Sequence, residues 1–442
     1  MYIGRINSKE LDLKSKMLIF WLSELFILTL LRFVLTNLGY EEGVLREVII
    51  WSVASLPLIY FLLNISKIKL KTYLPFVILI LIVIIVMLLS VLLNPKLSWF
   101  FVRPSYGIER ILRPDCAIFA FLFFYMIDDG KKLRDIIVTY AYVYFIYLVI
   151  LHLIPALIRG YWIDIGPDGI ETQFTYNLSF GYSVAFPVIV FLYDFIKNKK
   201  IYSLLFLMFS SWSLITQGNR GALLIVLVYV GLLIFKNIKN SKYVALKTSM
   251  LLLFMILLII YGKELLFYTA KSLNNLGIES RNIKKILNGS FSDDNGRDII
   301  WSTVAESINS GGILGHGMLG DRPFVFPLHY AGYSHNIFLE LLSNFGLLGI
   351  LISIYLIFKI VRMLFICDNE DWYNVYIIFL SCSVQLLLSM SFWYVWQFWA
   401  TLAISSKYFK LKKEKTNLQF TKKRGIYGYW KRDRFNRYNR IF

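Results

Sequence analysis

Residues 335–349 read His335-Asn-Ile-Phe-Leu-Glu-Leu-Leu-Ser-Asn-Phe-Gly-Leu-Leu-Gly349, a polar pair followed by an apolar run. The run predicts the start of a membrane helix, so His335 should lie where water, a polar substrate and the lipid headgroups meet. An imidazole there can accept a proton near neutral pH. This stretch alone leaves two interpretations open: His335 accepts a proton, or it only caps the helix.

The composition is that of a membrane protein. Of the 442 residues, 57% are hydrophobic and 17% are charged, and the mean hydropathy is +0.61. Runs with almost no charge, such as residues 74–93, are long enough to cross a bilayer as a helix. Residues 17–38 are too long for the core of a signal peptide and lack a small-residue cleavage site, so a retained helix is expected there.

These runs predict an all-α polytopic membrane protein with about 12 transmembrane helices, counted against the roughly 20 residues that one span requires. The expected spans are residues 17–38, 47–64, 74–94, 111–127, 136–158, 178–196, 202–216, 219–235, 247–267, 335–358, 373–390 and 392–406. Residues 1–406 should therefore form one transmembrane domain, followed by a basic tail at residues 407–442.

Lysine and arginine in the short loops predict the orientation. Basic residues gather in alternate loops, at residues 67–71, 131–134, 197–200 and 236–247. With these loops inside, both termini are cytoplasmic and one large loop, residues 268–334, is extracytoplasmic.

The tail, residues 407–442, carries 13 Lys and Arg residues against two acidic ones. Because it directly follows a membrane helix, it is expected to contact anionic membrane lipids. Its aromatic residues would also suit a nucleic-acid-binding tail, but this is the less favoured alternative, and no nucleic-acid partner is expected.

The extracytoplasmic loop should contain an amphipathic helix, because apolar residues recur at helical spacing from Ile300 to Ile308 and Asp294 or Asn295 can cap it. Five of the ten residues 311–320 are glycine, which predicts an irregular backbone. Asp293 and Asp294, together with the loop histidines His316, His329 and His335, suggest a metal site only weakly, because no third ligand follows at a regular spacing. No metal and no other cofactor is therefore expected.

Two arginines of the predicted outer side are candidates for binding a phosphate. Arg220 lies where the chain turns between two short spans, and Arg297 lies at the start of the loop helix. The planar guanidinium fork suits a phosphate, and a helix N-terminus adds a favourable site for an anion. Arg297 has an acidic neighbour that offers an ion pair instead, whereas Arg220 has none close in sequence.

Other charged residues near the spans have two explanations. Arg103 and Arg110 flank the fourth span and are candidate substrate-binding residues, although ion pairs would explain them, and Arg113 beside them, at least as well. Glu24 and Arg32 lie within the first span. They are expected to form ion pairs between packed helices more often than a proton relay.

Four motifs in a fixed order carry a resemblance. They are Gly218-Asn-Arg-Gly-Ala-Leu-Leu224, Gly296-Arg-Asp-Ile-Ile-Trp301, the Gly-Ile-Leu-Gly-His-Gly pattern at 312–317, and the stretch 335–349. Together they resemble the O-antigen ligase and Wzy-type polysaccharide polymerase superfamily, which is similar to the membrane-embedded class C glycosyltransferases.

The resemblance implies a reaction at the outer face of the bacterial inner membrane. A glycan would move from a polyprenyl-diphosphate carrier to an acceptor, without a metal. The functional residues of the family would map onto Arg220, Arg297 and His335, with Asn336 orienting the histidine or the acceptor hydroxyl. In this interpretation His335 takes the proton of the attacking hydroxyl, and the two arginines neutralise the charge of the departing diphosphate.

Three functions remain open. A polymerase would use a lipid-linked repeat unit as both donor and acceptor, with a chain-length regulator and a flippase as further partners. A ligase would transfer the glycan to lipid A core or to a protein, and the same motifs fit both enzymes. A polysaccharide flippase or transporter would also suit about 12 spans, but transporters more often consist of repeated halves. The polymerase is favoured.

Overall fold

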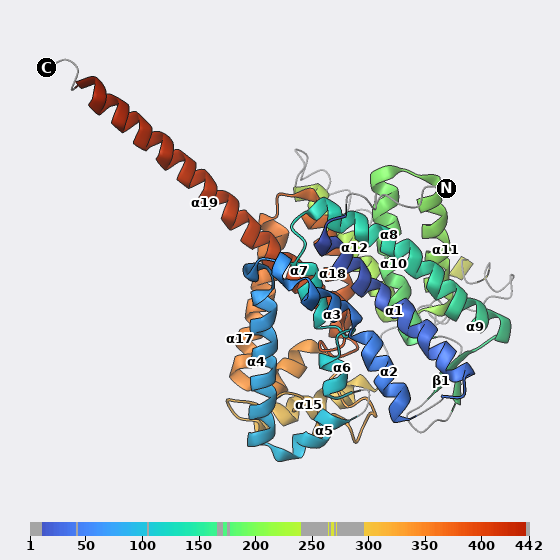
Figure 1. The fold of residues 1–442 in the computed structure, drawn as a ribbon. Coiled ribbons are helices and arrows are strands. Elements are labelled where there is room, and N and C mark those ends of the chain that lie inside the picture. The colour runs from blue at the N-terminus through green and yellow to red at the C-terminus, as the bar shows by residue number, and fades with distance from the viewer. Residues whose placement is uncertain are drawn as a thin grey trace.

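The computed structural model describes residues 11–438, apart from 41–42, 104–105, 166–170, 175–176, 240–263, 265–266, 269–270 and 272–295. Helices make up most of these residues (Figure 1). This agrees with the predicted all-α membrane class. Most of the predicted span 247–267, and Asp294 and Asn295 as candidate caps, lie outside the described residues.

Long apolar helices alternate with short connecting ones. Their bounds are α1 Leu13–Asn37, α2 Val44–Ala54, α3 Leu56–Leu63, α4 Leu70–Leu93, α5 Ser98–Val102, α6 Ile108–Leu112, α7 Phe119–Tyr125, α8 Gly130–Leu148, α9 Ile154–Arg159, α10 Leu178–Asn198, α11 Ile201–Gln217, α12 Arg220–Lys239, α15 Arg297–Ser310, α16 Arg322–Val325, α17 Ile337–Ile366, α18 Glu370–Ser383 and α19 Trp396–Tyr438. A π-helical turn, Val149–Leu153, joins α8 to α9.

Among the described residues, six helices are long and apolar enough to cross a membrane: α1, α4, the continuous stretch from α8 to α9, α10, α12 and α17. The pair α2 and α3 would add a seventh span, bent by 42°. The predicted count of about 12 spans is therefore not confirmed. One reason is length, because α11 has 17 residues and α7 has 7, fewer than a straight span requires.

The helix α10 lies at the centre of the bundle and packs against α8, α11, α12 and α18. It is apolar around most of its circumference, and Phe186, Ile189 and Phe191 are buried. A helix with this composition is stable only when other helices or lipid enclose it.

A short hairpin was not part of the predicted class. Strands β1 (Trp162–Ile165) and β2 (Glu171–Phe174) pair antiparallel, with Trp162 opposite Phe174. Trp162 donates its indole N–H to the side-chain oxygen of Gln217 at 2.8 Å, which fixes the hairpin to the end of α11.

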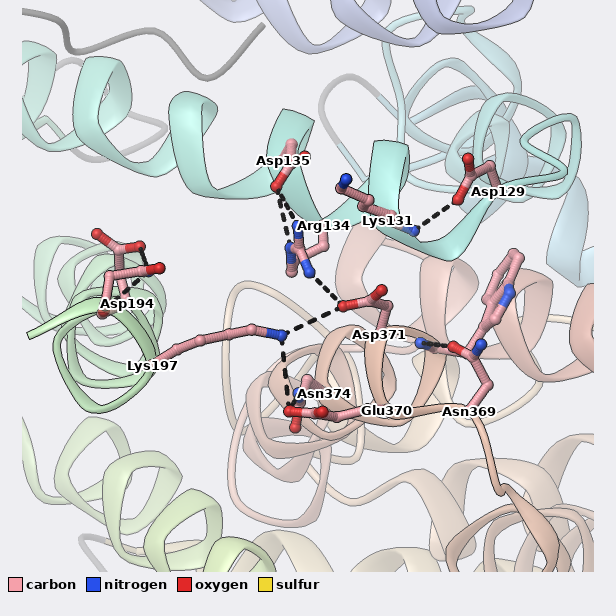
Figure 2. A network of polar contacts seen from close by, with 12 residues as sticks. Asp129, Lys131, Arg134, Asp135, Asp194, Lys197, Asn369, Glu370, Asp371 and Asn374 are labelled. Atoms are coloured by element: carbon pink, nitrogen blue, oxygen red, sulfur yellow. Dashed lines mark hydrogen bonds and ion pairs between the residues drawn. The ribbon is translucent and has the colours of Figure 1, made fainter.

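Charged residues from three predicted inner loops meet at one end of the bundle (Figure 2). Arg134 on α8 forms ion pairs with Asp135 and with Asp371 at the start of α18. Lys197 at the end of α10 approaches Asp371 at 3.4 Å and Glu370 at 3.6 Å. These contacts hold the three loops on one side of the bundle, as the predicted topology requires.

The helix α19 continues far beyond the bundle (Figure 1). It joins the predicted last span and the basic tail in one helix of 43 residues. Ion pairs fasten the start of the tail to the bundle, between Lys407 and Asp128 at 2.5 Å and between Lys412 and Asp368 at 3.0 Å.

A break in α17 receives the glycine-rich segment, residues 311–320. The helix is interrupted at Gly346, which has φ +51° and ψ −126°. The N–H of Gly317 donates to the carbonyl of Asn344 at 2.8 Å, and the carbonyl of Ile313 accepts from the first N–H after the break at 2.9 Å. These bonds replace helical ones that the break removes. The irregular backbone predicted for the segment is confirmed.

Candidate active site

A cavity of about 650 Å³ is lined by Leu178 at the start of α10, whereas Lys197 of the charged network lies at the other end of that helix. Its volume is typical of cavities that bind small molecules. Its lining combines cations, aromatic rings and imidazoles, including Arg32, Arg46, Arg110, Tyr106, Tyr330, Tyr333, Tyr394, His329 and His335. Such a mixture suits a polar, anionic ligand that has flat apolar faces.

His335 enters this cavity immediately before α17. Its backbone has φ +53°, a conformation that residues other than glycine rarely adopt. The ring lies 4.5 Å from that of Tyr333 and 5.0 Å from that of His329, between ring centres. Its Nδ1 is buried and has no hydrogen-bond partner among the described residues. The imidazole is therefore held by packing and keeps one nitrogen available.

The capping role falls to Asn336. Its side-chain oxygen accepts from the N–H groups of Phe338 at 3.0 Å and Leu339 at 3.3 Å. An asparagine in this position satisfies donors that the helix leaves unpaired. Because Asn336 caps α17, His335 is not required for the cap and is placed by it.

Burial and nearby cations lower the pKa of His335 from 6.5 to about 3. Burial is the largest cause, and His329, Arg297 and Arg322 add to it. The low pKa leaves the ring neutral at physiological pH, so it can accept a proton. It also makes the ring a weak base while the cations are uncompensated.

Arg220 begins α12, and its neighbours explain the surrounding motif. Asn219 caps the helix by accepting from the N–H of Ala222 at 2.9 Å, and its amide donates to the carbonyl of Leu178 on α10 at 2.8 Å. A Cβ atom on Gly221 would lie 2.1 Å from the hydroxyl of Tyr182. The motif thus brings the N-terminus of α12 against α10.

Arg297 begins α15, the helix predicted from the spacing of its apolar residues. Ile300 and Val304 of that helix pack with Val325 in a small separate core. Arg297 is within electrostatic range of His335 and also of Tyr182 on α10. Tyr182 therefore links the surroundings of Arg220 and Arg297, and Arg297 links them to His335.

The three arginines near the fourth span have different surroundings. Arg113 is paired with Glu109 at 2.7 Å and Asp115 at 2.6 Å, which confirms the ion-pair explanation for this residue. Arg110 is exposed and lines the cavity. Arg103 donates to the carbonyl of Tyr330.

The Arg103 guanidinium packs against aromatic rings and forms no ion pair with a described acidic residue. It lies 4.6 Å from the ring centre of Tyr106 and 4.5 Å from that of Phe326. Its Nη1 is buried without a hydrogen-bond partner among the described residues. Arg103 is not among the residues that line the cavity, but it contacts Tyr106 and Tyr330, which do line it.

A buried ionic network below the cavity was not predicted. Arg322 is 1% exposed and contacts Asp321 at 2.8 Å and Glu340 at 3.1 Å. Ser391 donates to Glu340 at 2.5 Å, and Ser334, the residue before His335, donates its backbone N–H to Asp321 at 2.9 Å. The network thus fixes the backbone that leads into His335. The one clue in the sequence was Glu340 within an apolar run, because such an acid needs a buried partner.

Other candidates are distributed around the site. His316 bonds to the carbonyl of Ser307 at 2.7 Å, within the loop. The ion pairs expected for Glu24 and Arg32 are absent among the described residues, where both oxygens of buried Glu24 lack a hydrogen-bond partner. That expectation was wrong because α1 presents both side chains to cavities. Within the part of the chain that the structure describes, no group of three potential metal ligands occurs. Asp294 and its acidic neighbour lie outside that part.

Comparison with known families supports the resemblance. The family model of O-antigen ligase matches residues 204–354, a range that contains Arg220, Arg297 and His335. The predicted relation to the O-antigen ligase and Wzy-type superfamily is thereby confirmed for this part of the chain. Searches of curated proteins and of solved structures give no match.

Proposed function

We propose that this protein is a glycosyltransferase that polymerises O-antigen or capsular polysaccharide repeat units. It transfers a glycan from a polyprenyl-diphosphate carrier to a hydroxyl of a lipid-linked repeat unit, at the outer face of the bacterial cytoplasmic membrane. Both termini lie in the cytoplasm. The observation that carries the proposal is His335, which lines the cavity, has an unpartnered Nδ1 and lies within electrostatic range of Arg297, all within the range that matches the O-antigen ligase family.

The reaction has three linked changes. The acceptor hydroxyl oxygen forms a bond to the anomeric carbon of the donor glycan, and the bond from that carbon to the diphosphate oxygen breaks. The hydroxyl proton moves to His335, which is neutral and able to receive it. Arg220 and Arg297 bind the diphosphate and offset the charge that it gains on leaving.

Donor binding also strengthens the base. Arg297 and Arg322 are among the causes that lower the pKa of His335. A bound diphosphate cancels part of this positive field, so the pKa of His335 rises while the donor is present. The imidazole then becomes an effective base only when a donor is in place, which protects against wasteful proton transfer.

An apolar groove in the protein, next to His335, can hold the lipid chain of the carrier. A cavity of about 190 Å³ between α17, α18 and α19 begins at Ile337 and Phe338 and reaches Leu356 and Leu402. Its walls are almost entirely apolar, which suits an isoprenoid. A carrier seated there would have its diphosphate near His335.

The remaining candidates contact substrate or position the base. Arg110 lines the cavity and binds the polar part of the substrates, whereas Arg103 acts by holding Tyr106 and Tyr330, which line the cavity. Asn336 acts indirectly, because its capping bonds set the direction of the chain at His335. No metal takes part in the reaction as proposed, in agreement with the resemblance.

The proposal is tested with purified protein in lipid nanodiscs and a polyprenyl-diphosphate-linked repeat unit as the only glycan. A ladder of longer lipid-linked products supports a polymerase. Transfer that occurs only after lipid A core or a protein acceptor is added indicates a ligase. A chelator should leave the ladder unchanged, and arrest that added metal reverses would overturn the metal-free mechanism.

A further inference from the structure

A second group of arginines lines the same cavity from the elements farthest in sequence from His335. Arg32 lies in the last third of α1, Arg46 in the first turn of α2 and Arg110 in α6. Arg32 is within electrostatic range of both other members and of Arg113. These three residues, Arg32, Arg46 and Arg110, are called the second arginine group below.

The positive charge of this group is poorly compensated. The acids Glu109 and Asp115 are both engaged by Arg113, at 2.7 Å and 2.6 Å. Among the described residues, Glu47 is the remaining carboxylate that lines this cavity, and Glu24 lines a neighbouring cavity with Arg32 and Arg110 without forming an ion pair to them. No member of the group has an ion pair with a described residue, and the Nε of Arg46 is buried without a hydrogen-bond partner.

Such an arrangement is costly without a ligand. Three guanidinium groups around one cavity repel each other, and a buried N–H without a partner loses its hydrogen bond to water without replacement. An anion that reaches all three would remove both penalties. Guanidinium groups bind phosphate oxygens in pairs, which makes a phosphate-containing ligand the best match.

We infer that the second arginine group binds the diphosphate of the acceptor, while Arg220 and Arg297 bind that of the donor. This inference rests on the proposed polymerase, because only there does the acceptor also carry a lipid diphosphate next to its glycan. The glycan of the acceptor lies between the two positions, against the tyrosine rings of the cavity. Tyr106 and Tyr394 belong to this lining, and Tyr394 donates to the backbone carbonyl of Tyr106 at 2.5 Å.

The kinetic test uses a donor whose terminal hydroxyl is blocked and three acceptors. The first is a neutral glycan on a lipid diphosphate, made inert as a donor by a methylene in place of the oxygen that joins its anomeric carbon to the diphosphate. The second is the same glycan on an uncharged lipid, and the third carries a uronic acid on that uncharged lipid. The variants are Arg46→Gln, Arg46→Lys and the control Arg159→Gln, which lies exposed at the end of α9.

Arg46→Gln should raise the KM for the first acceptor about tenfold or more, since contacts to charged groups are worth roughly 1.5–3 kcal/mol. The KM for the second acceptor, the KM for the donor and kcat should stay near wild type. Arg46→Lys should be intermediate, and Arg159→Gln unchanged. An equal rise for the first two acceptors, or a rise confined to the uronic acid acceptor, would overturn the assignment.

A binding measurement separates this inference from the proposed function. Calorimetry with a short-chain prenyl diphosphate should find two sites in the wild type, of which Arg46→Gln removes one and Arg297→Gln the other. If the wild type elongates no glycan yet shows this pattern, the polymerase fails and the second site stands. If Arg46→Gln retains both sites, the second site fails whatever the activity.

Discussion

His335 owes its chemistry to the residues around it. The cap formed by Asn336 sets its position, Tyr333 and His329 hold its ring, and burial, followed by the charges of His329, Arg297 and Arg322, keeps its pKa low. Removing the imidazole of His335 removes the candidate proton acceptor. The surrounding structure does not depend on its Nδ1, because this atom has no hydrogen-bond partner among the described residues. Substitution there should therefore affect chemistry more than folding.

His335→Ala should lower the elongation rate by about 10²–10⁴-fold, as expected for a positioned base. Lipid-linked single repeat units should accumulate, because the steps before transfer are intact. The matched control is His152→Ala, in the π-helical turn that joins α8 to α9 and outside the cavity. The measurement compares the product ladders of the two variants at matched protein levels. Normal elongation by His335→Ala refutes the catalytic role.

Two substitutions of Arg297 can separate the effect of its positive charge from the effect of its forked guanidinium. Arg297→Gln removes a charge that lowers the pKa of His335, so this pKa should rise towards its ordinary 6.5. Because protonated His335 is inactive as a base, the acid limb of kcat/KM should move to higher pH. Arg297→Lys keeps the charge and the acid limb but loses the fork, so only the rate should fall. The pH dependence of kcat/KM for both variants measures this, and an acid limb that stays in place for Arg297→Gln contradicts it.

At the scale of elements, the broken helix α17 connects the helical bundle to the glycine-rich segment, residues 311–320. Its interrupted backbone bonds are completed by the glycine-rich segment, residues 311–320. Neither element has a full set of hydrogen bonds without the other. The start of α17, which follows the candidate base His335, is therefore as stable as this docking.

Gly346→Ala should destabilise this junction. A Cβ atom there would lie 2.3 Å from the carbonyl oxygen of Ile313, and the residue has φ +51°. The expected cost is about 1–3 kcal/mol or more, visible as a lower unfolding temperature and faster proteolysis of the loop. Gly231→Ala on α12 is the control, because nothing lies within 4 Å of its Cβ position. Equal stability of the two variants would show that the docking is not required.

The tail of α19 should be dispensable for chemistry. Truncation after Lys415 keeps the ion pair of Lys412 with Asp368 but removes most of the projecting helix. Membrane association or assembly should weaken, since basic residues near anionic lipid contribute about 1 kcal/mol each. Fractionation and the in vitro elongation assay test both parts. Loss of elongation by a truncated protein that is inserted and stable would contradict this separation.

The whole molecule has two chemically different ends. The ion pairs of Arg134 and Lys197 lie at the end of α10 (Figure 2), and the cavity with His335 lies at the start of that helix. This polarity follows from the alternation of basic loops along the chain. It requires that the two ends face different compartments if the protein spans the membrane as proposed.

Cysteine labelling tests the orientation directly. The natural cysteines are buried, so they give little background. Ser302→Cys on the exposed face of α15 should react with an impermeant reagent in intact cells, whereas Lys131→Cys at the start of α8 should react only after lysis. The reverse pattern would invert the proposed topology.

Apolar runs predicted most long helices, because periodicity and length depend on local sequence alone. The α15 helix, the irregular segment 311–320 and the pairing of Arg113 were predicted for the same reason. Three features required distant residues and could not be predicted: the break at Gly346, the partners of Arg322, and the cavity to which Arg32 contributes. Each depends on a contact between segments that are far apart along the chain.

The docking of residues 311–320 into the break at Gly346 also constrains the order of biogenesis. The loop is synthesised before α17, so it waits with unpaired backbone groups until that helix has entered the membrane. The cap at Asn336 and the buried Arg322–Glu340 pair become complete only at that moment. A nascent chain therefore has no assembled candidate site around His335 before α17 is in place, so the proposed transfer could start only after that step.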